Sequence, residues 1–90
     1  MYLGKVVGTV VSTTKDESLV GSKLLVVTKL NESLQPMDTS EIAVDSVGAG
    51  VGEIVLVSKG SSARYVLNKP DSPIDSAIVG IVDTVEVDGV

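Results

Sequence analysis

The sequence predicts an all-β domain, namely a small five-stranded OB-like β-barrel with at most one short helical turn. About a quarter of the 90 residues are valine or isoleucine, and β-branched side chains favour strands. Short apolar runs alternate with segments rich in Gly, Pro, Ser, Asp and Asn, which are turn-forming residues. A single small sheet would leave an apolar face in water, and closing it into a barrel removes the exposed edges.

Five main strands are expected along the chain. The first covers residues 2–12, where pairs of valines are interrupted by Gly4 and Gly8. A glycine inside a strand often marks a bend, a bulge or a close backbone contact. The other expected strands are, in order, residues 23–30, 41–46, 53–59 and 77–87.

Two polar loops and two shorter features lie between these strands. The loops cover residues 13–22 and 31–40, the second of them interrupted by Pro36. Residues 64–67 either extend the fourth strand or form a short strand of their own. Residues 73–77 suit one helical turn, because Ser72 can cap it and Pro73 can occupy its first position.

Composition indicates one domain, residues 1–90, without catalytic equipment. The chain has no Cys and no His, so a disulfide, a thiolate and a Ser-His-Asp triad are excluded. The net charge of −5 disfavours nucleic acid and anionic membrane as partners. No apolar run approaches the ~18–20 residues that span a bilayer, and the start lacks a signal-peptide pattern, which favours the cytosol. A small domain that is 43% hydrophobic with only two aromatic residues suits a subunit of an assembly.

The densest motif is VDSVGAGVGEIVLVSKGSSAR, residues 44–64. Its glycines, Gly48, Gly50, Gly52 and Gly60, mark tight turns or places where another backbone comes close. GAGVGE resembles half of a dinucleotide fingerprint, but a strand follows it where that fingerprint requires a helix. The neighbour of this stretch is therefore a ligand or another copy of the protein, and the second is favoured.

Charged residues give few further signals. The acidic residues are scattered without the spacing of a calcium loop, and solvated surface charges explain them. Arg64 is the only arginine among seven basic residues. Its planar guanidinium suits an anionic ligand or, the favoured alternative, a carboxylate or carbonyl of an adjacent subunit.

Three blocks of the chain resemble a known family, the pentameric vertex proteins of bacterial microcompartment shells (EutN/CcmL type). They are residues 4–27, GKVVGTVVSTTKDESLVGSKLLVV, residues 43–64, AVDSVGAGVGEIVLVSKGSSAR, and residues 73–87, PIDSAIVGIVDTVEV. The resemblance implies a structural protein rather than an enzyme, with no cofactor and no metal. It implies a cyclic homopentamer that caps vertices of a polyhedral shell in the bacterial cytoplasm, next to hexameric or pseudohexameric shell proteins.

The resemblance also suggests roles for particular residues near the subunit interface or the five-fold axis. Arg64 is expected to bridge subunits, with Asp45 or Asp83 as its partner. The expected interface or pore-proximal residues are Gly48, Gly50, Gly52, Gly60, Ser61, Ser62, Ala63 and Arg64.

Two alternatives remain at this point. One is a small OB-like binding module for nucleic acid or another ligand, although such barrels use stacking aromatics and a basic groove. The other is a co-chaperonin-like ring cap, which would use residues 13–22 as a mobile loop with Leu19 and Val20 as its apolar anchor.

Overall fold

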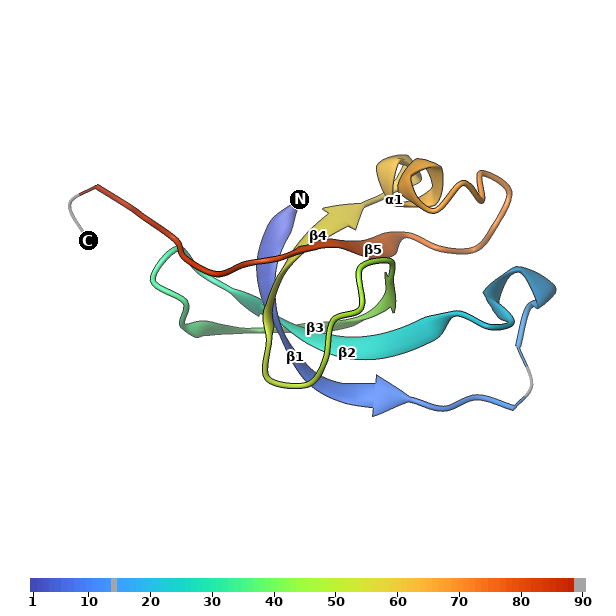
Figure 1. The fold of residues 1–90 in the computed structure, drawn as a ribbon, viewed down its shortest axis with the longest axis horizontal. Coiled ribbons are helices and arrows are strands. Elements are labelled where there is room, and N and C mark those ends of the chain that lie inside the picture. The colour runs from blue at the N-terminus through green and yellow to red at the C-terminus, as the bar shows by residue number, and fades with distance from the viewer. Residues whose placement is uncertain (14, 89–90) are drawn as a thin grey trace.

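The computed structural model describes residues 1–13 and 15–88, and five of its segments form a closed barrel (Figure 1). The elements are β1 (Tyr2–Val10), the single 3-10 turn η1 (Glu17–Leu19), β2 (Lys23–Leu30), β3 (Pro36–Asp45), β4 (Ile54–Lys59), α1 (Ser61–Val66) and β5 (Ser76–Ile81). Around the barrel the strands follow the order β1-β2-β3-β5-β4. The predicted five-stranded barrel with one short helix is therefore confirmed.

Strand β1 is shared by the two sides of the barrel. It pairs antiparallel with β2 along its length and with β4 over Tyr2–Lys5 alone, and its register with β2 shifts between Val6 and Gly8. At Gly4 an added Cβ would collide with the side chain of the fully buried Val27. The two glycines of β1 therefore mark a close contact and a bend, as the sequence indicates.

The barrel closes through a short seam between β3 and β5. These strands run parallel and pair only at Val44–Ala77 and Asp45–Ile78, whereas the other neighbours are antiparallel. In the described part of the chain, residues 36–43 of β3 therefore pair with β2 alone. Residues 7–10 of β1 likewise pair with β2 alone, so the barrel keeps two open strand edges.

Two apolar clusters hold the fold together. The larger fills the barrel with the buried residues Val6, Leu25, Val27, Ala43, Ala49, Val55, Val57 and Ile78. The smaller consists of the buried residues Val44, Ala63, Ile74 and Ala77. It packs α1 and the segment before β5 against the barrel wall, so Figure 1 shows the helix beside β4 and β5.

The second hairpin loop is shorter than predicted, because β3 begins at Pro36 rather than at residue 41. Asn31 organises the remaining five-residue loop: its Oδ1 accepts hydrogen bonds from the backbone N–H of Ser33 at 2.9 Å and of Gln35 at 3.0 Å. Residues 36–40 are exposed, and Pro36 and Ser40 pair with β2 across a register shift. Polar side chains on an open edge hid this strand from the apolar pattern.

The helix lies where the sequence suggested a strand. Residues 64–66 belong to α1, and residues 73–77 enter β5 without the predicted helical turn. Gly60, at φ 67°, turns the chain after β4, and the helix that follows buries Ala63 against the second cluster. The Ser72 hydroxyl donates to the carbonyl of Lys69 at 2.8 Å instead of capping a helix.

The first and last strands both end earlier than predicted. β1 ends at Val10 instead of residue 12, and β5 ends at Ile81 instead of residue 87. The last backbone contact of β5 with β4 runs from Val82 N to Ile54 O at 2.8 Å. Because β4 begins at Ile54, the chain beyond residue 82 has passed the end of its neighbour.

Candidate functional site: the glycine loop and the short helix

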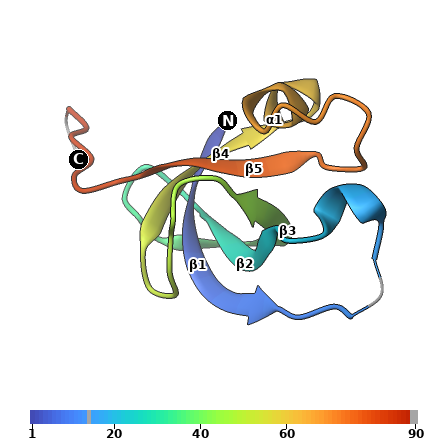
Figure 2. The same ribbon diagram turned by 45° about the vertical axis from the view of Figure 1, so that its right-hand side comes forward.

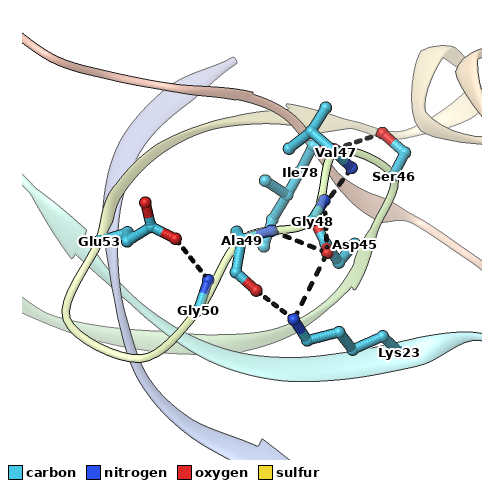
Figure 3. A network of polar contacts seen from close by, with 9 residues as sticks. All are labelled: Lys23, Asp45, Ser46, Val47, Gly48, Ala49, Gly50, Glu53 and Ile78. Atoms are coloured by element: carbon cyan, nitrogen blue, oxygen red, sulfur yellow. Dashed lines mark hydrogen bonds and ion pairs between the residues drawn. The ribbon is translucent and has the colours of Figure 1, made fainter.

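The glycine loop, residues 46–53, connects β3 to β4 and is organised by one carboxylate. Asp45 Oδ1 accepts from Val47 N at 3.1 Å, and its Oδ2 accepts from Gly48 N and Ala49 N, both at 2.9 Å (Figure 3). The Asp45 side chain is 3% exposed. Three backbone donors aimed at one buried carboxylate satisfy its charge and fix the path of the loop.

A lysine from β2 completes this arrangement. Lys23 Nζ lies 3.8 Å from Asp45 Oδ2 and donates a hydrogen bond to the carbonyl of Ala49. Ala49 itself is fully buried in the barrel core beside Val6 and Leu25. The loop is therefore part of the core rather than a flexible lid.

One further bond lies within the loop, and others join the loop to the barrel. Gly50 N donates to Glu53 Oε1 at 2.7 Å, and Gly52 N donates to the carbonyl of Val6 in β1 at 2.8 Å. The Ser46 hydroxyl donates to the carbonyl of Ile78 in β5 at 2.6 Å. β1, β2 and β5 thus each hold one part of the loop.

The glycines of the loop differ in what they do. Gly48 and Gly52 have φ of 83° and 94°, and no atom of the described chain lies within 4 Å of a Cβ added there. Positive φ, rather than crowding within the subunit, requires glycine at these two turns. Gly50 shows no positive φ. The loop presents Val47 and Val51 to solvent, which the glycine pattern alone did not predict.

The GSSAR sequence forms the start of α1 instead of a turn. Ser61 and Ser62 are exposed, Ala63 is buried, and Arg64 Nη1 donates to the carbonyl of Ile74 at 2.9 Å. The sequence reasoning missed the exposed side chain that follows: Tyr65 is 73% exposed. The sequence did contain an indication of its importance, because Tyr65 is one of only two aromatic residues and directly follows the GSSAR motif.

The predicted partners of Arg64 lie apart from it within one subunit. Arg64 is engaged with the segment before β5, whereas Asp45 is occupied by its own loop and by Lys23. Asp83 is exposed beyond the end of β5. Within one subunit, neither Asp45 nor Asp83 contacts the Arg64 guanidinium. An ion pair between subunits stays a prediction.

A polar cluster that the sequence did not reveal connects four strands. Glu41 of β3 accepts from Tyr2 of β1 and from Lys59 of β4, at 2.7 Å each, through its two carboxylate oxygens. Lys59 Nζ also donates to the Ser76 hydroxyl of β5 at 2.9 Å and lies 3.8 Å from Asp75 Oδ2. This Glu41 cluster joins β3 to β4 and β5 beside the short parallel seam.

The Glu41 cluster has a structural rather than a catalytic character. Burial and the hydrogen bond to Glu41 raise the pKa of Tyr2, so its phenol remains a donor. The hydrogen bond from Lys59 lowers the pKa of Glu41 and keeps it a carboxylate. Among residues 1–13 and 15–88, no group of three or more His, Cys, Asp or Glu is arranged to hold a metal ion.

The loop required by the ring-cap alternative is anchored to the barrel. It contains η1, whose first turn is capped by Asp16 through a 2.9 Å bond from Ser18 N. Leu19 packs against the second apolar cluster, whereas Val20 is 65% exposed. In the described residues, no helix is both long and apolar enough to cross a membrane.

Fold and site together define a class: a small β-barrel whose glycine motif organises structure and whose surface suits contact with other subunits. Comparison with known proteins gives the family. Residues 1–83 match the family model described as "Ethanolamine utilisation protein EutN/carboxysome". The chain therefore belongs to the EutN/CcmL family, and it is a structural shell protein of that family rather than an enzyme.

Individual relatives agree over almost the whole length. The microcompartment shell vertex protein GrpN of Rhodospirillum rubrum is 65% identical over 86 residues, covering 96% of this chain and 97% of the relative. PduN, a microcompartment shell vertex protein of Salmonella typhimurium, is 54% identical over 88 residues, covering 93% and 97%. A solved structure described as the GrpN pentameric microcompartment shell protein of R. rubrum superposes with a TM-score of 0.89 at 63% identity, covering 97% and 99%.

Proposed function

We propose that this chain forms cyclic pentamers that occupy the vertices of a bacterial microcompartment shell. The observation that carries the proposal is the 65% identity, over nearly the whole of both chains, to a shell vertex protein whose solved structure is described as pentameric. A flat hexagonal sheet cannot close on itself, and five-fold units supply the curvature. We propose hexameric or pseudohexameric shell proteins as the neighbours of this ring.

The surface of the subunit supports assembly. Large apolar side chains are exposed on several elements, among them Val7 at 50%, Val51 at 62%, Tyr65 at 73% and Val66 at 52%. In a cyclic ring each subunit offers two different patches, one to each neighbour. Exposed apolar side chains on β1, on the glycine loop and on α1 suit such an interface.

The motif residues have proposed places in the ring. Open space lies above Gly48, Gly52 and Gly60, so a neighbouring backbone can approach there. The exposed hydroxyls of Ser61 and Ser62 suit an interface or the surroundings of the five-fold axis. The remaining residues proposed near that interface are Gly50, Ala63 and Arg64.

Arg64 is proposed to bridge to Asp83 of the adjacent subunit. Of the two carboxylates suggested by the sequence, Asp45 is 3% exposed and already accepts four contacts, whereas Asp83 is exposed. Arg64→Ala is expected to weaken the ring, and Arg64→Lys to rescue part of it, because Lys keeps the charge without the planar fork. An Arg64→Ala variant that assembles like the wild type contradicts the bridge.

Mass in solution tests the ring itself. Native mass spectrometry or light scattering is expected to give about 46 kDa, which is five times the 9.2 kDa chain. Mixing the purified ring with hexameric shell proteins and imaging the product then tests the vertex role, which predicts closed polyhedral particles. A monomer or dimer at high protein concentration contradicts the proposal, and so do open sheets that the added protein leaves unchanged.

A further inference from the structure

We infer that residues 82–88, here called the tail segment, add as a β-strand to the open edge of β1 in the adjacent copy of this chain. The inference rests on the proposed ring. It concerns a segment that the sequence predicts to be strand and that the barrel leaves without a strand partner. Figures 1 and 2 both show this segment continuing past the barrel, away from α1.

The tail segment has the composition of a strand. Its sequence is VDTVEVD, in which four of seven residues are Val or Thr, and these residues favour extended structure. Val85 and Val87 alternate with Thr84 and Glu86, the two-residue period of a strand. In the described residues its only backbone bond to another strand runs from Val82 N to Ile54 O, so a strand-forming segment lies beside no sheet.

The tail segment also presents apolar side chains at a cleft. Together with the loop between β2 and β3 it lines a cleft of about 480 Å³, formed by Glu32, Ser33, Leu34, Val85, Glu86 and Val87. Leu34 is 40% exposed and Val87 is 38% exposed. Apolar side chains beside unpaired backbone are typical of a segment that pairs with another chain.

The open edges of β1 and β3 can both receive the tail segment, and their charges favour β1. The tail segment carries Asp83, Glu86 and Asp88. The open edge of β3 includes the exposed Asp38, which would repel such a strand. The open edge of β1 begins next to the exposed Lys5, which attracts it.

The edge of β1 is also apolar. Val7 is 50% exposed and Val11, just beyond the strand, is 89% exposed. Val51 of the glycine loop is 62% exposed and precedes Gly52, which bonds to Val6 at the start of this edge. Three valines therefore flank the free backbone of β1 and offer partners for Val85 and Val87.

The tail segment and the open edge of β1 are two different surfaces of the subunit, as a cyclic ring requires. In Figure 1 the tail segment leaves one end of the molecule, while the second half of β1 runs toward the other. A contact between two different surfaces repeats from copy to copy and closes a ring when the rotation fits. A segment that met its own counterpart would instead give a two-fold dimer.

Cysteine pairs test the inference, because the native chain contains no Cys. Val85→Cys is combined in turn with Val7→Cys or Thr9→Cys on β1, and with Met37→Cys or Thr39→Cys on β3. Disulfides form only where two Cα atoms lie within roughly 7 Å. Oxidation is expected to give a reducible ladder up to a covalent pentamer from a β1 pair, and no ladder from the β3 pairs.

The outcomes separate this inference from the ring proposal. If the native chain is not a pentamer, the ring proposal fails. If the variants are pentameric but only the β3 pairs cross-link, or no pair does, the inference is wrong while the ring stands.

Proline substitution supplies a second test. N–H groups of successive strand residues point to opposite sides, so either Thr84→Pro or Val85→Pro removes a donor aimed at the receiving edge. At least one of them is expected to raise the concentration at which the ring half-dissociates by tenfold or more. The matched control Thr84→Val keeps the donor and the β-branch and leaves Val85 in place, and is expected to stay near the wild type. Rings of wild-type strength in both proline variants overturn the inference.

Discussion

The glycine loop and the tail segment both follow strands of the barrel, but they differ in how many of their backbone groups form hydrogen bonds within the subunit. The loop returns to the barrel: Asp45 accepts three of its N–H groups, and Gly52 bonds to Val6. The tail segment leaves the barrel after one bond from Val82 to Ile54. The N–H groups of the loop find acceptors within the same subunit, three of them at Asp45 a few residues away, whereas a strand-forming segment needs a partner strand that the same chain need not supply.

This difference assigns different consequences to mutations in the two regions. Changes in the glycine loop are expected to alter the stability of each subunit, because its contacts lie inside the barrel. Changes in the tail segment are expected to alter assembly alone.

Asp45→Ala is expected to destabilise the subunit most. It removes a carboxylate that is 3% exposed, which leaves three backbone donors without their acceptor and Lys23 without its ion-pair partner. The expected loss is about 3 kcal/mol in the free energy of unfolding, measured by urea denaturation. As the control, Asp71→Ala removes an exposed carboxylate to which no contact is assigned and is expected to leave stability within about 0.5 kcal/mol of the wild type. Equal stability of the two variants contradicts the role assigned to Asp45.

Substituting two glycines of the loop tests why glycine is required there. Gly52→Ala places a side chain at φ 94° and is expected to cost roughly 1–2 kcal/mol. Gly50→Ala has no positive φ to adopt, and its Cβ would lie 3.5 Å from Glu53 Oε1, an ordinary contact. We expect Gly50→Ala to change stability by less than about 0.5 kcal/mol. A larger cost at Gly50 than at Gly52 would show that close approach by another copy, rather than backbone conformation, selects glycine here.

The Glu41 cluster predicts a smaller effect that depends on pH. The hydrogen bond from Lys59 lowers the folded-state pKa of Glu41. The contribution of the Glu41 carboxylate to stability is therefore complete above its unfolded-state pKa of about 4.3. It is lost as the pH falls through the lower folded-state value. Because the Glu41 side chain is 29% exposed, Glu41→Gln is expected to cost less than about 1 kcal/mol at pH 7.

The measurement is a series of urea midpoints for both proteins from pH 7 down to pH 2.5. The gap between wild type and Glu41→Gln is expected to close at the acid end. A gap that stays constant over this range would contradict the assigned contribution of the Glu41 carboxylate.

The apolar pattern of the sequence predicted correctly those strands whose apolar run has the same length as their backbone pairing. The bounds of β2, Lys23–Leu30, are those expected, because an apolar run is flanked by turn residues on both sides. The prediction failed where a partner decided the structure. β3 extends to Pro36 because β2 provides backbone partners as far as Leu30, and β5 stops at Ile81 because β4 begins at Ile54.

The candidate site shows the same division. The turns at Gly48 and Gly52 follow from residue type, since few other residues adopt positive φ. The Glu41 cluster could not be predicted, because Tyr2 and Glu41 are 39 positions apart in the chain. The exposure of Tyr65 depends on which face of a six-residue helix covers the second apolar cluster, and a helix this short has too few residues to show a period.

By itself, the sequence determined the barrel class, the absence of histidine and cysteine chemistry, and the resemblance to a shell family, because these depend on composition and on motifs contiguous along the chain. The three-dimensional fold was needed to show that Asp45 makes its contacts inside its own subunit and that Arg64 contacts Ile74. It was also needed to show that two strand edges and the tail segment have no strand partner within the described subunit. The physical reason is that a backbone donor is satisfied by whichever group lies within about 3 Å of it. Such neighbours are set by the closure of the barrel rather than by order along the chain.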